Sequence, residues 1–267
     1  MLVTCPSGLS FQARKWRIGD RRNLHDQKVI RSGLLMRKML EAVDEGVESL
    51  GPYEDFQQGK PAKWPKVSLV DIVDALLYIR IQSRPELDYN EVCENCGAQI
   101  PLTIDLRELE REPMSQEGKD HLSTGEPMAA LIPLREPDES NGEEAPIADV
   151  KLRMLLGEHM PTLTKHYKQD PTTQQEVQMV MHIVELQAPG MDRPLDRFKD
   201  IHKFYAQQDW YFQEKLDDEI AKLGGGTNTL VDMACQRCSA EQQGILPFAT
   251  EFFYPRKRRS TSSMVTH

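Results

Sequence analysis

Two stretches of the chain alternate apolar with polar residues, and each predicts a pair of antiparallel strands. The first extends from Leu2 to Trp16 and contains a Pro6-Ser7-Gly8 turn. The second combines the apolar run from Ala129 to Leu134 with the alternating run from Val150 to Met154. Since alternation with a period of two places every second side chain on one face, we expect a half-buried β-hairpin at each place.

Each predicted hairpin is followed by a short connection and an amphipathic segment. Ile18-Gly19-Asp20 follows the first hairpin, and Leu156-Gly157-Glu158 takes the same place after the second. Apolar residues then recur at steps of three and four between Leu34 and Val47, and again between Val177 and Leu186. This spacing is typical of one buried helix face, so we expect a helix over each segment.

The order of features remains common to both halves further along the chain. Gly51-Pro52 and Pro189-Gly190 break the pattern after the two amphipathic segments. A second helix is expected after each break, over Leu69 to Gln82 and over Leu195 to Leu223. Each half then ends in a C-x-x-C motif, which we expect to lead into a short strand over Ile100 to Leu106 or Ile245 to Phe253.

This shared order indicates an internal duplication. The predicted fold class is α+β, with a β-hairpin, helices, a C-x-x-C knuckle and a strand in each half, joined by a four-cysteine zinc-ribbon-like site. We expect the first repeat over residues 1–112 and the second over residues 113–255, with an acidic loop at 135–145. Residues 256–267 are basic and rich in serine and threonine, which predicts a flexible tail.

Composition and charge narrow the function classes. The chain has 267 residues and a formal net charge of −9, and an acidic protein is repelled by phosphate backbones. We therefore expect no general nucleic-acid binder. The sequence contains no apolar run long enough for a membrane span and no signal-peptide pattern among its first residues. Synthesis in the cytosol follows as an expectation, and cytosolic C-x-x-C motifs are read first as metal ligands.

The cysteines predict the main site. Cys93 and Cys96 form one C-x-x-C motif, and Cys235 and Cys238 form the other. Two such pairs supply the four thiolates of a tetrahedral structural zinc site. Because each repeat contributes one pair, we expect a single Zn²⁺ to join the two repeats, and we expect metal binding to be coupled to their docking.

The residues that follow the motifs support a knuckle turn. Gly97 comes directly after the first motif and accepts a positive φ, and Ser239 holds the matching place after the second. Cys5 is isolated in an apolar strand and is interpreted as a small buried hydrophobe.

Other interpretations of the four cysteines remain open. An iron–sulfur cluster also accepts four thiolates, and sequence does not separate it from zinc. Redox C-x-x-C motifs usually begin a helix, whereas these precede strands. A catalytic zinc needs an open coordination position, which four thiolates do not leave.

We find no catalytic pattern in the sequence. None of the seven histidines lies in an H-E-x-x-H or H-x-E motif, and no nucleophile elbow, Walker loop or dinucleotide fingerprint occurs. His159 and His166 are interpreted as structural. Trp210, Tyr211 and Phe212 cannot all face inward on one helix, so we expect one of them at a protein interface. We therefore expect a non-catalytic protein without a small-molecule substrate.

Taken in order, these motifs resemble those of the baseplate hub assembly proteins of contractile-tailed bacteriophages. The resemblance rests on the opening Val3 to Leu9, on Ile104 to Leu109 after the first cysteine pair, on Leu152 to Glu158, and on Leu246-Pro247-Phe248 after the second pair. It covers nearly the whole chain except the acidic loop and the basic tail.

The resemblance implies a virion or assembly protein of the tail baseplate, with hub or wedge subunits as partners. It also implies localisation in the host cytoplasm during assembly and, where the particle retains the protein, in the virion tail. The alternative is a zinc-ribbon nucleic-acid-binding accessory protein. Such a ribbon would carry basic and aromatic strands, whereas the strands expected here are apolar and acidic.

Overall fold

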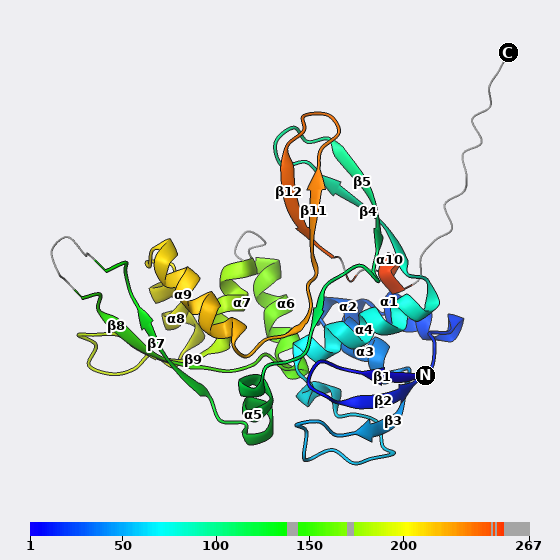
Figure 1. Ribbon diagram of the computed structural model, residues 1–267, viewed down its shortest axis with the longest axis horizontal. Coiled ribbons are helices and arrows are strands. Elements are labelled where there is room, and N and C mark those ends of the chain that lie inside the picture. The colour runs from blue at the N-terminus through cyan, green and yellow to red at the C-terminus, as the bar shows by residue number, and fades with distance from the viewer. Residues whose placement is uncertain (138–143, 170–173, 247, 249, 254–267) are drawn as a thin grey trace. The chain divides into compact units, whose positions relative to one another are not determined.

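The computed structural model describes residues 1–137, 144–169, 174–246, 248 and 250–253 (Figure 1). They form two compact units, each built from two separate segments of the chain. Unit 1 comprises the described residues of Met1–Ile79 and Glu110–Thr227, and unit 2 comprises those of Arg80–Leu109 and Asn228–His267. Residues from both halves of the sequence are therefore found in each unit. The predicted basic tail and most of the predicted acidic loop lie outside the described residues.

The first half of unit 1 contains a three-stranded antiparallel sheet in the order β1-β2-β3 (Figure 1). The predicted hairpin is confirmed, because Val3 pairs with Phe11. Its strands and the helices before β3 are β1 Leu2–Thr4, β2 Ser10–Ala13, the 3-10 helix η1 Ile18–Arg21, α1 Arg22–His25, α2 Gln27–Arg31, α3 Leu35–Glu41 and β3 Asp44–Ser49.

The second half of unit 1 contains another three-stranded antiparallel sheet, β7-β8-β9. The second hairpin is also confirmed, since Ala130 pairs with Val150. The elements in order are β7 Met128–Pro133, β8 Ile147–Leu152, η3 Gly157–His159, α6 Met160–Gln169, α7 Gln174–His182 and β9 Ile183–Gln187. In both sheets the second and third strands are separated by a 3-10 helix and α-helices.

The remaining elements of unit 1 connect and cover these sheets. They are η2 Trp64–Lys66, α4 Leu69–Ser83, α5 Gln116–Thr124, α8 Phe198–Tyr205, α9 Trp210–Ala221 and the short antiparallel pair of β6 Arg111–Glu112 with β10 Gly226–Thr227. Helix α4 begins in unit 1, and its last residues belong to unit 2.

Unit 2 consists mainly of two antiparallel hairpins (Figure 1). The first is β4 Glu86–Val92 with β5 Gln99–Asp105, and the second is β11 Leu230–Ala234 with β12 Glu241–Ile245. A short helix, α10 Thr250–Phe253, follows. The fully buried Arg80 side chain donates from Nε to the Phe252 carbonyl oxygen at 2.6 Å and thereby holds this helix.

Two predicted helices are too long, and both differ from the structure in the same way. The helix expected over Leu34 to Val47 ends at Glu41, and the chain continues as β3. The helix expected over Val177 to Leu186 ends at His182 and continues as β9. Apolar residues four apart fit a strand as well as a helix, and β-branched residues such as Ile183 favour the strand. Gly46, with φ +138°, excludes a helix in β3.

Two other predictions also need correction. The region expected as one helix over Leu195 to Leu223 is divided into α8 and α9, because Asp209 begins a new helix by accepting from the Phe212 N–H. The strand expected over Ile245 to Phe253 lies earlier in the chain, as β12. The last residues of the expected strand form the helix α10 instead. The helix predicted over Leu69 to Gln82 is confirmed as α4.

An apolar core packs under the β7-β8-β9 sheet. The core residues share burial of more than nine-tenths of their surface and come from the sheet, α7, α8 and α9; they include Ile132, Val150, Leu152, Val180, Leu186, Ile201, Phe212 and Leu216. Phe212 is fully buried while Trp210 is 65% exposed, which agrees with the expectation that the three consecutive aromatic residues cannot all face inward.

The two halves of unit 1 approach each other closely at Gly157. Its N–H donates to the Val67 carbonyl oxygen at 2.8 Å, and the Leu69 N–H donates to the Leu155 carbonyl oxygen at 2.8 Å. A Cβ atom at position 157 would lie 2.3 Å from the Trp64 carbonyl oxygen. Only glycine fits this position without a shift of the backbone.

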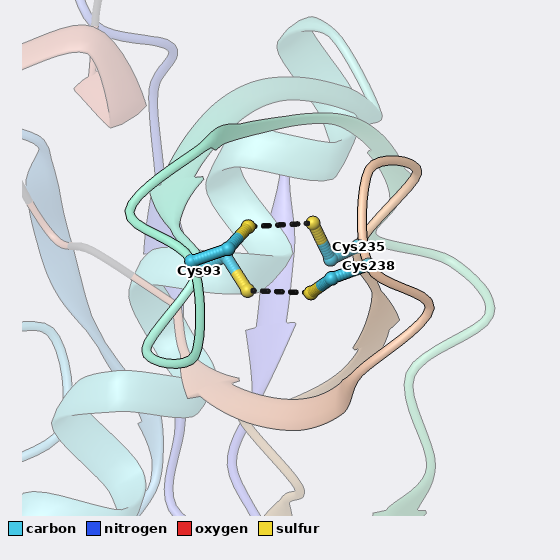
Figure 2. Close-up of side chains that lie close together, drawn as sticks. Cys93, Cys235 and Cys238 are labelled. Atoms are coloured by element: carbon cyan, nitrogen blue, oxygen red, sulfur yellow. Dashed lines mark hydrogen bonds between the residues drawn. The ribbon is translucent and has the colours of Figure 1, made fainter.

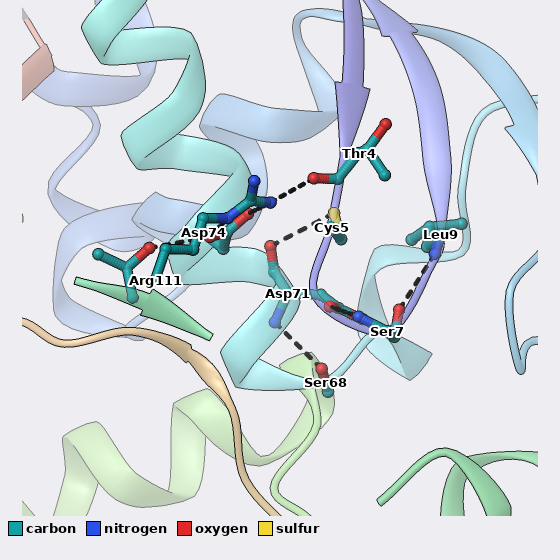
Figure 3. A network of polar contacts seen from close by, with 9 residues as sticks. Thr4, Cys5, Ser7, Leu9, Ser68, Asp71, Asp74 and Arg111 are labelled. Atoms are coloured by element: carbon teal, nitrogen blue, oxygen red, sulfur yellow. Dashed lines mark hydrogen bonds and ion pairs between the residues drawn. The ribbon is translucent and has the colours of Figure 1, made fainter. Parts of the chain in front are cut away.

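A buried network of polar groups joins α4 to the β1–β2 turn (Figure 3). The Asp71 carboxylate accepts from the Tyr53 hydroxyl at 2.5 Å and from the Ser7 N–H at 3.1 Å. Burial raises the pKa of Asp71, and these donors oppose the rise. Asp74 lies about one turn further along α4. Its carboxylate accepts hydrogen bonds from Nε and Nη2 of Arg111, each at 2.6 Å. Both buried carboxylates therefore have partners, as burial requires.

Candidate metal centre

Each C-x-x-C motif forms the turn of a hairpin in unit 2. Cys93 follows β4 and Cys96 precedes β5, while Cys235 and Cys238 occupy the same places between β11 and β12. The strand predicted after the first motif is confirmed as β5, whereas the strand after the second motif lies earlier in the chain than predicted. The strands before the motifs, β4 and β11, were not predicted. The residues before the first motif, Glu86–Val92, are largely charged or polar, so their sequence has no strong period-two signal.

The two turns have the same backbone hydrogen bonds. In the first, the Gly97 N–H donates to the Cys93 carbonyl oxygen and the Cys93 N–H to that of Ala98, both at 2.8 Å. In the second, the Ser239 N–H donates to the Cys235 carbonyl oxygen at 2.8 Å, and the Cys235 N–H donates to that of Ala240 at 2.9 Å. Each turn thus holds its two thiols on one side of the hairpin.

Both turns need a left-handed residue directly after the second cysteine. Gly97 has φ +68° and Ser239 has φ +57°. Ser239 is the only residue other than glycine with a positive φ in the described part of the chain. A side chain in this conformation costs free energy, which indicates that the turn geometry itself is required.

The four thiols converge (Figure 2). The Sγ atoms of Cys93 and Cys238 are 3.6 Å apart, as are those of Cys96 and Cys235, and all four lie within 4.8 Å of one another. Four sulfurs at the corners of a tetrahedron, each about 2.3 Å from a central ion, would be about 3.8 Å apart. The arrangement therefore fits one tetrahedrally coordinated ion.

The same distances exclude disulfides in this state. A disulfide requires an S–S distance of about 2.05 Å, and all four cysteines are free. The two 3.6 Å contacts also join different motifs, whereas a redox C-x-x-C disulfide forms within one motif.

The surroundings of the thiols favour metal-binding thiolates in part of the cluster. The Ala240 N–H and the Asn95 side chain lower the pKa of Cys238 to about 6. The Ala98 N–H lowers the pKa of Cys96, but desolvation and the three neighbouring cysteines outweigh it and raise that pKa to about 12. Four adjacent thiolates repel one another, and a bound cation would remove this repulsion.

Gln242 was not singled out in the sequence, although it connects the two hairpins. Its Oε1 accepts from the Glu94 N–H at 3.1 Å, and its Nε2 donates to the Val92 carbonyl oxygen at 3.2 Å. A glutamine in a polar strand carries no sequence signal for this role. Ile100 and Met233 complete a small core around the buried thiols of Cys93 and Cys235.

The remaining predicted residues are placed apart from this cluster. Cys5 is buried in unit 1 with its thiol near the Asp71 carbonyl oxygen, and burial raises its pKa well above the usual range. His159 caps η3, because its Nδ1 accepts from the Leu156 N–H at 2.9 Å. His166 stacks on Phe198 with ring centroids 4.2 Å apart. Within the described residues, no other group of histidine, cysteine and acidic side chains converges in this way.

Comparisons with known proteins identify no relative of this chain. No protein-family model, no curated protein and no solved structure matches the chain. Among the described residues, none of the helices has the length and apolar character needed to cross a bilayer.

Proposed function

We propose that unit 2 holds one structural Zn²⁺ through Cys93, Cys96, Cys235 and Cys238. The convergence of four thiols from two matching turns carries this proposal. An iron–sulfur cluster would distribute the four cysteines over two or four iron atoms, so cysteine sulfurs on different irons would be farther apart than those of one shared ion. All four sulfurs lie within 4.8 Å of one another, which favours the single ion.

We further infer that the chain is internally duplicated, with one knuckle contributed by each half. Both halves contain a three-stranded meander with a 3-10 helix and α-helices between its second and third strands. Both then continue through helices to a hairpin whose turn is a C-x-x-C motif. Both amphipathic segments were predicted as helices, and both end in a strand, β3 or β9. This shared difference from the prediction also supports the duplication.

On this basis we propose a non-catalytic structural or assembly protein of a contractile phage tail baseplate. The support is the resemblance of its motifs together with a four-thiolate site that leaves no coordination position for a substrate. Several large apolar side chains are available for protein contacts, with Leu131 and Trp210 each 65% exposed and Ile245 67% exposed. Hub or wedge subunits are the partners we propose.

The nucleic-acid alternative gains no support from unit 2. Acidic side chains outnumber basic ones along its hairpins, where Glu86, Asp88, Glu91 and Glu94 precede or enter the first turn. A phosphate backbone would be repelled by this charge.

The baseplate proposal can be tested by cross-linking mass spectrometry on tail assembly intermediates from cells in which the particle is being made. We expect cross-links from lysines of this chain to hub or wedge subunits. Recovery of the chain without any cross-link to a tail protein, or in a complex that nuclease treatment dissolves, would contradict the proposal.

A further inference from the structure

Two arginines hold equivalent positions in the two halves of unit 1. Arg14 follows β2, and its N–H donates to the Val43 carbonyl oxygen. Arg153 follows β8, and its N–H donates to the His182 carbonyl oxygen in the same manner. Each guanidinium group also donates to the carbonyl oxygen of the residue that precedes this acceptor, Arg14 from Nη2 to Ala42 and Arg153 from Nε to Met181.

The partner of the first arginine is a carboxylate. Arg14 binds Asp20 through two N–H groups at 2.8 and 2.9 Å. Asp20 lies six residues after Arg14, in η1, and it also accepts from the Arg17 N–H at 2.6 Å. The Arg14 side chain lowers the pKa of Asp20, as expected for a bidentate ion pair.

The residue that corresponds to Asp20 in the second half is a histidine. His159 lies six residues after Arg153, in η3, and accepts from the Leu156 N–H through Nδ1. Since Nδ1 is the acceptor, a neutral ring carries its proton on Nε2. His159 therefore reproduces the capping hydrogen bond of Asp20 but cannot supply its negative charge.

Arg153 consequently lacks a counterion in the part of the chain that the structure describes. It is partly buried, and among the described residues Nε is the one guanidinium nitrogen that donates a hydrogen bond, and no carboxylate forms an ion pair with the group. Burial lowers its pKa, and the nearby Glu158 only partly opposes this effect. A desolvated charge without a partner costs free energy, so a ligand that supplies one would be stabilised.

The Arg153 guanidinium lines a hollow large enough for such a ligand. The hollow has a volume of about 690 Å³, and Leu122, Pro127 and Val184 contribute apolar walls. On one side of the hollow, the His121 side chain holds the backbone at Met154, because its Nε2 accepts from the Met154 N–H at 3.0 Å.

The charges around the hollow favour a monoanion over an anion of higher charge. Lys66 lies on its wall but is already paired with Asp55 at 3.0 Å. Glu54 and Glu158 also line it, and these carboxylates would repel a phosphate, with its higher charge, more strongly than a carboxylate. A planar carboxylate also matches the two parallel donors of a guanidinium.

We propose that this hollow binds a carboxylate of a peptide, with Arg153 as the bidentate donor and the His159 Nε2–H as the second donor. The ligand's carboxylate takes the place that Asp20 holds beside Arg14. The inference goes beyond the proposed baseplate role and does not depend on it, because small probes on the purified chain test it directly.

The test is an NMR titration of the metal-loaded full chain at pH 7 and constant ionic strength. The probes are N-acetylglycine, with a terminal carboxylate, N-acetylglutamic acid α-amide, with a side-chain carboxylate, and inorganic phosphate. We expect saturable shifts of the Arg153 Nε–Hε, Leu156 N–H and His159 ring signals with at least one of the carboxylates. Absence of saturable shifts, or tighter binding of phosphate than of both carboxylates, would overturn the proposal.

Variants distinguish this site from general charge attraction. Arg153→Gln should weaken carboxylate binding at least about tenfold, the effect of losing about 1.4 kcal/mol of interaction. Lys66→Gln removes the same charge from the same hollow and should change the affinity less than about twofold, since the exposed Lys66–Asp55 pair contributes little.

His159→Asp offers a test that does not depend on losing an interaction. It should supply the missing carboxylate from within the chain, raise the thermal midpoint of unit 1, and abolish binding of the external carboxylate. The reciprocal Asp20→His variant should create a second carboxylate-sensitive arginine at Arg14. Undiminished binding in His159→Asp that remains folded would contradict the assigned geometry.

Discussion

Unit 1 and unit 2 achieve stability by different means. Unit 1 buries an extended apolar core under its β7-β8-β9 sheet and pairs its buried carboxylates within the protein. Among the described residues, the buried core at the cysteine end of unit 2 consists of Cys93, Ile100, Met233 and Cys235, and two of these four residues are proposed metal ligands. Small β-hairpin structures rarely bury enough apolar surface to fold alone, and metals commonly supply the difference.

The two units should therefore respond to different perturbations. Metal loss should affect the hairpins of unit 2 while the sheets of unit 1 remain. Changes in packing or in histidine protonation should affect unit 1 while metal content stays the same.

The largest expected effect is that of Cys93→Ser. Loss of one thiolate should release the metal and unfold both hairpins, because binding of structural zinc supplies on the order of 10 kcal/mol. Hydrogen exchange should show loss of protection over β4, β5, β11 and β12 and retained protection in β7–β9. Cys5→Ser is the matched control, since Cys5 lies in unit 1. Equal protection of the hairpins in both variants would contradict a metal-dependent unit 2.

A second prediction concerns packing in unit 1. Gly157→Ala should destabilise this unit by about 2–4 kcal/mol, because the new Cβ would lie 2.3 Å from the Trp64 carbonyl oxygen. Gly19→Ala is the control at the corresponding place of the first half, where no atom lies within 4 Å of the added Cβ. Chemical denaturation with metal analysis should give a large loss for the first variant, little change for the second, and full metal content in both. Similar stabilities would show that the close approach at Gly157 is not required.

A third prediction concerns pH. Burial lowers the pKa of His182 to about 4, and its ring donates to the Arg153 carbonyl oxygen from Nδ1. Because an unfolded histidine has a pKa of about 6.5, the unfolded chain binds more protons between about pH 6.5 and 4. Stability present above pH 6.5 should therefore be lost as the pH falls, by about 2 kcal/mol for a partly exposed ring.

The variant that tests the pH effect is His182→Asn, which retains a donor near the position of Nδ1 without titrating in this range. Denaturation of unit 1 at pH 7 and pH 5 should show a smaller difference in this variant than in the native chain. An unchanged pH dependence would assign the effect to other groups, such as His121 and His159, whose pKa values are also lowered by burial.

The smallest expected effects distinguish the two knuckles. Gly97→Ser should destabilise unit 2 by about 1 kcal/mol, because it places a side chain at φ +68°. Ser239→Gly should relieve the same strain but increase the freedom of the unfolded chain, for a net gain of about 0.5 kcal/mol or less. The midpoint of metal release during chelator titration should shift in opposite directions. Shifts of the same sign would contradict the equivalence of the two turns.

Much of the local structure could be predicted because it depends on local chemistry. Alternation identified both hairpins of unit 1, and the spacing of the cysteines identified all four members of the cluster. Gly97 indicated the left-handed turn before its geometry was known. Each of these signals lies within a few residues of the structure that it specifies.

The missed features depend on contacts between distant segments. Strand β3 forms because β2 offers backbone partners, whereas its sequence alone also fits a helix. Gln242 is important only because the first hairpin lies beside it. The unpaired charge of Arg153 becomes visible only when its position is compared with that of Arg14. The repeat boundaries and the baseplate role remain predictions.

The most direct test of the metal centre is elemental analysis of the purified native chain by inductively coupled plasma mass spectrometry. The proposed site predicts about one zinc per chain, which chelation removes with release of four reactive thiols that were protected before. A stoichiometric amount of iron would contradict zinc as the bound metal. Absence of any metal, with four reactive thiols and hairpins that remain protected from hydrogen exchange, would contradict the structural role proposed for the four cysteines.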